Sequence, residues 1–144
     1  MDQRLSFVTL ATPDLDAARA FYRDAFGWEP HLDVPGEIVF YQVAPGLLVG
    51  FFDAASFDRD LGLPAGSTSG VSGMTLAHNV GDRAGVYTLA SAAVAAGAAV
   101  VKPPQESEFG GIFHALVRDP NGVVWEIAHN PGHRVEADGT VVLG

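Results

Sequence analysis

The hydrophobic positions of this chain follow the same pattern twice. In each copy a short apolar run meets an aspartate, an amphipathic stretch with helical spacing follows, and a glycine ends it. The residues that mark the two copies are Phe7, Asp14 and Gly27, then Met74, Asp82 and Gly97. A repeat at an offset of about 68 residues is typical of a duplicated module. The pattern therefore predicts a strand followed by a helix in each half of the chain.

The first half contains signals for further strands. Residues 5–12 read as a strand, Asp14 is a suitable N-cap, and Gly27 suits the left-handed position that ends a helix. Apolar runs over 37–43 and 47–52, joined by a Pro-Gly turn, predict a hairpin. Residues 53–73 are expected to form a connection, with 62–73 as the linker.

The second half repeats this order. The predicted elements are a strand over 74–80, a helix near 83–96, strands over 98–102, 112–118 and 123–129, and a short hairpin within 131–144. Asp119-Pro120-Asn121-Gly122 is the turn between the last two long strands. We expect one domain over 1–144, with a first module over 1–66 and a second module, including the tail, over 70–144.

Alternation along each strand predicts which side chains face the helices. Trp125 and Ile127 are large and apolar and belong under the helices, so Glu126 faces the other way. By the same alternation, the other face of the sheet carries Phe7, Thr9, Thr75 and Asn79, while His78 lies on the helix side. That other face needs a cover, which a partner chain, the other module or a ligand could supply.

Composition narrows the class of protein. Hydrophobic residues make up 48% and charged residues 17% of the 144, which is typical of a globular domain. The net charge is −9 without a basic stripe, so a nucleic-acid partner is not expected. The apolar runs are too short for a membrane span. With no cysteine and no visible secretory signal, we expect a cytoplasmic protein.

The chain resembles the vicinal-oxygen-chelate superfamily, which includes glyoxalase I, extradiol dioxygenases and bleomycin-resistance proteins. The resemblance rests on Pro13-Asp14 leading to Phe21-Tyr22 and Gly27, on Gly110-Gly111, and on Asp119-Pro120-Asn121-Gly122 followed by Glu126. It implies an α+β fold in which two tandem βαβββ modules form a curled mixed β-sheet around a cavity, with the helices on the outer face.

The resemblance also implies where a divalent metal would be held. Metalloenzymes of this superfamily use four side chains, usually His and Glu, and alignment assigns these positions to Phe7, Gly50, Thr75 and Glu126. Only Glu126 can donate strongly to a cation, and one carboxylate is too few. We therefore expect no metal and no cofactor. A rearranged metal site from His114, His129 and Glu126 is kept as an alternative.

Glu126 is the candidate catalytic residue. It could act as a general base or as a polar anchor for a ligand, or be a remnant held by backbone donors or an Arg. The candidate ligand-binding residues are Phe7, Thr9, Phe51, Thr75, Asn79, Phe109 and His114. The aromatic members could stack on a planar ligand, although each also suits core packing.

Three classes of function remain open. We expect a glyoxalase/bleomycin-resistance-like protein that lacks the usual metal site and holds a hydrophobic or aromatic small molecule in the sheet cavity, as a homodimer. The first alternative is a metal-independent lyase or isomerase with Glu126 as general base. The second is a glyoxalase or dioxygenase with rearranged metal ligands.

Overall fold

The structure, a computed structural model, describes residues 1, 3–68, 73–108 and 111–143. The first module contains β1 (Phe7–Thr12), α1 (Leu15–Phe26), β2 (Leu32–Val34), β3 (Ile38–Ala44), β4 (Leu47–Asp53) and α2 (Ala54–Asp60). The second contains β5 (Leu76–Asn79), α3 (Arg83–Ala95), β6 (Ala99–Glu106), β7 (Phe113–Arg118) and β8 (Val124–His129). A hairpin of β9 (His133–Val135) and β10 (Val141–Leu143) follows.

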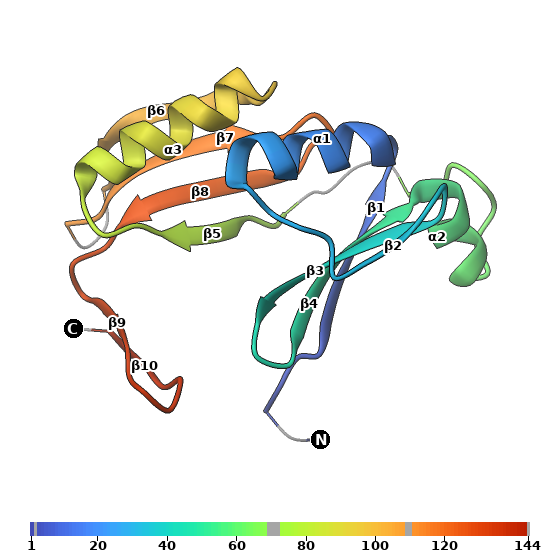
Figure 1. Cartoon of the computed structure of the whole chain (residues 1–144), viewed down its shortest axis with the longest axis horizontal. Coiled ribbons are helices and arrows are strands. Elements are labelled where there is room, and N and C mark those ends of the chain that lie inside the picture. The colour runs from blue at the N-terminus through green and yellow to red at the C-terminus, as the bar shows by residue number, and fades with distance from the viewer. Residues whose placement is uncertain (2, 69–72, 109–110, 144) are drawn as a thin grey trace.

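Each module forms a four-stranded mixed sheet, and the two sheets share one topology. The strand orders are β1-β4-β3-β2 and β5-β8-β7-β6, with one parallel pair in each sheet, β1/β4 and β5/β8. Helices α1 and α3 lie beside each other above the sheets (Figure 1). The α+β class and the duplicated βαβββ module are confirmed. Within the described residues the two sheets stay separate, so one chain does not close them into a barrel.

Helix α1 begins and ends where the sequence predicts. The Asp14 carboxylate accepts a hydrogen bond from the Ala17 N–H, and Gly27 has φ +66°, the left-handed conformation that a C-terminal glycine permits. Between them the buried face has helical spacing. Its members are Leu15, Ala18, Phe21, Tyr22 and Ala25.

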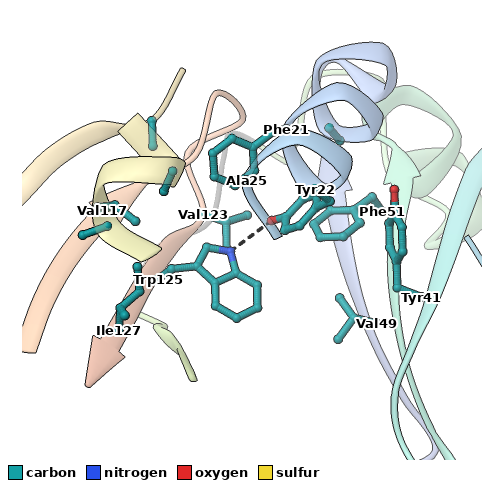
Figure 2. Close-up of a cluster of buried hydrophobic side chains, with 14 of the residues drawn as sticks. Phe21, Tyr22, Ala25, Tyr41, Val49, Phe51, Val117, Val123, Trp125 and Ile127 are labelled. Carbon is teal, nitrogen blue, oxygen red and sulfur yellow. Dashed lines mark hydrogen bonds between the residues drawn. The ribbon is translucent and has the colours of Figure 1, made fainter. Parts of the chain in front are cut away.

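The core between the modules is aromatic. Tyr22 stacks on Phe51 with a centroid distance of 4.4 Å, and the indole N–H of Trp125 donates to the Tyr22 hydroxyl at 3.1 Å (Figure 2). Since Trp125 belongs to β8 and Tyr22 to α1, this core joins the second sheet to the first module. Burying such large rings supplies much of the free energy that holds the two modules together.

A buried hydrogen-bonded cluster, which we call the latch, fixes the same junction. Asp119 is 4% exposed and accepts hydrogen bonds from the Tyr22 hydroxyl at 2.7 Å and from the N–H groups of Asn121 and Val123. The Asn121 side chain bonds both the N–H and the carbonyl of Asp14, 107 residues away. The Asp-Pro-Asn-Gly turn thus ties β7 and β8 to the start of α1.

Three segments differ from the prediction. The connection expected over 53–73 contains helix α2, whose N-cap Asp53 accepts from the Ser56 N–H. The strand expected over 98–102 continues as β6 to Glu106, which an edge strand allows because its outward N–H positions can be proline. Strand β2 was not predicted because three residues give no periodic signal. The predicted C-terminal hairpin is confirmed.

None of the helices in the described residues is both long enough and apolar enough to span a membrane.

Candidate functional site

Glu126 and His114 lie on the sheet face away from the helices. Trp125 contacts the rings of α1, and Phe113 contacts Tyr87 of α3, so the residues after them, Glu126 and His114, point to the opposite side. We call the side of the sheet that faces away from the helices the open face. It is the side that strand alternation assigned to Glu126.

The two side chains form a close pair. The distance from His114 Nδ1 to Glu126 Oε1 is 2.7 Å; the Glu126 side chain is 31% exposed and that of His114 9%. His114 Nε2 is buried and has no hydrogen-bond partner in the part of the chain that the structure describes. A buried Nε2–H without an acceptor would be costly, so this geometry favours neutral His114 with its proton on Nδ1. His114 therefore donates, and Glu126 accepts.

The residues paired with Glu126 on the neighbouring strands are small or apolar, whereas β6 places Lys102 opposite Leu116 and Gln105 opposite His114 on the same face. On β5, Ala77 is paired with Glu126 and Asn79 with Ala128, while Leu116 lies opposite Glu126 on β7. Thr75, just before β5, and Asn79 are both exposed. Among the described residues, no second donor bonds Glu126. One carboxylate oxygen is thus left to accept a hydrogen bond from another molecule.

The corresponding face of the first module is aromatic. Thr9 of β1 is paired with Gly50 of β4, which is paired with Phe40 of β3. Phe7 is 56% exposed, and its ring lies edge-on to Phe40 at a centroid distance of 5.6 Å. The two modules therefore present unlike surfaces, one with aromatic rings and one with the Glu126–His114 pair.

The four-ligand metal site implied by the resemblance does not fit these residues. A Cβ atom at Gly50 would lie 2.6 Å from the Phe40 ring, so the ring occupies the space of a ligand side chain. Phe7 offers no donor. His129 is paired with Phe113 and lies on the helix side, apart from Glu126. Within residues 1, 3–68, 73–108 and 111–143, no three His, Asp or Glu side chains are grouped to hold a metal.

Phe51, Phe109 and His78 are three further residues whose placement was predicted from the sequence. Phe51, expected to contact a ligand, is fully buried in the core against Tyr22, because its strand position faces α1. That expectation is wrong. Phe109 lies outside the described residues. His78 is on the helix side as predicted, yet it is exposed, because β5 is an edge strand.

The aromatic cover over Gly50 was missed from the sequence. Glycine inside an apolar strand signals that another group approaches the backbone closely, and this signal was available at Gly50. The His114–Glu126 contact was also missed. Counting outward from the turn places His114 near His129, whereas the observed contact is diagonal, between a residue and the second neighbour of its paired residue.

Comparison with known proteins agrees with this fold. Residues 4–127 match the family model described as the Glyoxalase/Bleomycin resistance protein/Dioxygenase superfamily. No curated protein matches the chain.

Solved structures give the same result. A glyoxalase-related enzyme from Fulvimarina pelagi is 36% identical, with 99% of both chains covered and a TM-score of 0.88. A lactoylglutathione lyase from Agrobacterium tumefaciens is 27% identical, with 88% of this chain and 93% of that chain covered and a TM-score of 0.66. A glyoxalase/bleomycin resistance protein/dioxygenase family enzyme from Burkholderia phytofirmans PsJN is 25% identical, with 86% and 96% covered and a TM-score of 0.74. With a family match over most of its length, this chain belongs to the Glyoxalase/Bleomycin resistance protein/Dioxygenase superfamily.

Proposed function

We propose that this protein binds a hydrophobic or aromatic small molecule on the open face, with Glu126 as the polar anchor and without the divalent metal site of its superfamily. The observation that carries the proposal is the Glu126–His114 pair, 2.7 Å apart, with small or apolar Ala77 and Leu116 paired with Glu126 on the neighbouring strands. A carboxylate in such surroundings is costly unless it is paired or used, and His114 occupies only one of its two oxygens.

The chemistry of the pair defines the ligand. Glu126 accepts and does not donate, and neutral His114 spends its only N–H on Glu126. A matching ligand carries an N–H, O–H or cationic group beside an apolar body. The net charge of −9 also favours a cation over an anion at long range.

A homodimer would complete the site. Phe7 and Leu5 of the first module are 56% and 67% exposed, which is much apolar surface to leave in water. If a second copy placed this aromatic face opposite the Glu126 face of the first, the ligand would lie between aromatic rings and a carboxylate. The dimer is part of the proposal, and size-exclusion chromatography with light scattering measures it.

A second candidate function is a metal-independent lyase or isomerase with Glu126 as general base. The observation that favours it is the hydrogen bond from His114, which fixes one carboxylate oxygen and orients the other. A base must be held within hydrogen-bond reach of the proton that it removes. Turnover that is abolished in Glu126→Gln, with ligand binding retained, would support the enzyme over the binding protein.

The test is a thermal-shift screen of aromatic amines, matched neutral aromatics and divalent metals, alongside elemental analysis of the purified protein. We expect stabilisation by an aromatic amine, and about tenfold weaker binding in Glu126→Gln because a charge-assisted hydrogen bond is lost. Glu29→Gln, at an exposed glutamate, is the matched control and leaves binding unchanged.

Two outcomes would overturn the proposal. Stoichiometric Zn, Mn, Ni or Fe in the protein, with stabilisation by the same ion, would show a metal site. Equal ligand affinity in Glu126→Gln and in the wild type would make Glu126 a remnant.

A further inference from the structure

An apolar cavity lies on the helix side of the second sheet, opposite the open face. It adjoins the core where α1, α3, β5 and β8 meet, and has an inner chamber of about 140 Å³. The lining residues of this chamber are Phe26, Trp28, His78, Leu89 and Trp125. Since Trp125 and Glu126 are neighbours on β8 and point to opposite faces, this chamber is distinct from the proposed Glu126 site.

The inner chamber connects the helix junction to a larger groove between the modules. This groove has a volume of about 420 Å³ and shares Trp28, His78 and Trp125 with the chamber. Its walls come from both modules, with Val8 and Val49 on one side and Leu76 on the other. Among the described residues, no Asp, Glu, Lys or Arg lines the chamber or the groove. The chain contains 25 residues of these types, 8 basic and 17 acidic.

The size of the inner chamber suits one aromatic ring. A dry protein cavity of about 150 Å³ lined by apolar side chains is large enough to bind benzene. Here the walls are themselves aromatic, with Trp28 edge-on to Trp125 at a centroid distance of 5.6 Å. Aromatic rings pack well against such walls in edge-to-face geometry.

Apart from the two indole rings, His78 is the one polar side chain that the described residues contribute to the inner chamber. Its imidazole makes no hydrogen bond within the described residues, and it borders both the chamber and the groove. An imidazole nitrogen can accept a hydrogen bond from a hydroxyl or donate one to it. A ring with one such substituent would therefore satisfy His78 while its apolar part fills the chamber.

We propose that this chamber is a binding site for an uncharged aromatic ring with one hydrogen-bonding substituent, as in a phenol. The ring packs against the chamber walls formed by Trp28, Trp125 and Leu89, and the substituent bonds His78. Larger groups on the ring extend into the groove between the modules. This inference is independent of the proposed Glu126 site.

The two tryptophans make the test direct. Trp28 and Trp125 are the only tryptophans in the sequence, and both line the chamber, so intrinsic fluorescence reports on it. Titration with phenol should give a saturable change in tryptophan fluorescence, and benzene a weaker one. Absence of a saturable change with both compounds would overturn the proposal.

Three variants separate the parts of the site. Leu89→Phe fills the chamber and should abolish the fluorescence change, whereas Val94→Phe, at an exposed position of the same helix that does not line the chamber, should keep it. His78→Ala should weaken phenol about fivefold and leave benzene unchanged, because one hydrogen bond is lost. Equal phenol binding in Leu89→Phe and Val94→Phe, or in His78→Ala and wild type, would contradict the assignment.

Glu126→Gln distinguishes this inference from the proposed function. It should leave the phenol titration unchanged, because its side chain lies on the other face of β8. Loss of phenol binding in this variant would place the ligand on the open face instead.

Discussion

Two carboxylates seven residues apart illustrate how this fold separates stability from chemistry. Asp119 is 4% exposed and has three hydrogen-bond donors across its two oxygens. Glu126 has a side chain that is 31% exposed and one donor, His114. The first group holds two modules together, and the second still has an oxygen to offer. A carboxylate whose bonding capacity is filled from within is structural, while one left half-filled on an accessible face is available to a ligand.

The surroundings of each group strengthen the contrast. Burial raises the pKa of Asp119 despite its hydrogen bonds, and burial beside Asp119 raises the pKa of Tyr22, so that hydroxyl remains a donor. The latch is thus self-contained. Glu126 instead lies among Ala77, Leu116 and Ala128, which offer it no donor side chain.

The largest expected effect comes from removing the latch carboxylate. Asp119→Ala leaves the Tyr22 hydroxyl and the N–H groups of Asn121 and Val123 without their acceptor, which should cost about 3–5 kcal/mol of unfolding free energy. Urea denaturation followed by circular dichroism measures it. Asp60→Ala, at an exposed aspartate, is the control and should leave the midpoint unchanged. A loss below about 1 kcal/mol would show that the modules are held by packing alone.

The second expected effect compares two asparagines. Asn121→Ala removes both bonds to the Asp14 backbone from a side chain that is 7% exposed, and should cost about 1–2 kcal/mol. Asn79→Ala, on the exposed open face, should change stability by less than about 0.5 kcal/mol. The same denaturation experiment measures both, and equal losses would remove the distinction between latch and open face.

The sequence carried most of the fold because its signals are local. Asp14 and Gly27 mark the two ends of α1 through capping chemistry that depends on neighbouring backbone groups alone. Alternation on β8 likewise placed Trp125 under the helices. Helix α2 was missed because a seven-residue helix shows too little periodicity, and its sequence follows a strand directly.

The site was harder to predict because it depends on contacts between strands. The register of β3 and β4 pairs Phe40 with Gly50, which places the Phe40 ring over Gly50. The same register directs Phe51 into the core. This register cannot be predicted from the amino-acid composition. Similarly, Glu126 was identified by its position in a motif, but its partner His114 is twelve residues away on another strand. The cross-module bond from Asn121 to Asp14 could not be foreseen from either segment alone.

The third prediction concerns the pH dependence of the latch. Because the folded state raises the pKa of Asp119, its protonation favours folding; the contribution is fully present below the ordinary carboxyl pKa of about 4 and is lost as pH rises through the raised value. Asp119→Asn cannot titrate, so its unfolding free energy minus that of the wild type should become more positive as pH rises through this window. Denaturation at a series of pH values from 4 to 8 measures the difference. A difference that is constant across the series would show that burial does not perturb Asp119.

The smallest expected effect tests the other side of the comparison. Glu126→Gln keeps an oxygen that can accept from His114 Nδ1, and the rest of the side chain faces solvent or ligand, so stability should change by no more than about 0.5 kcal/mol. The same substitution should weaken ligand binding. A change at Glu126 would thus affect binding without affecting stability, whereas a change at Asp119 affects stability. An interaction that a protein retains for a ligand need not stabilise the free fold. A loss of more than about 2 kcal/mol of unfolding free energy in Glu126→Gln would therefore show that the Glu126–His114 pair is a structural contact like the latch.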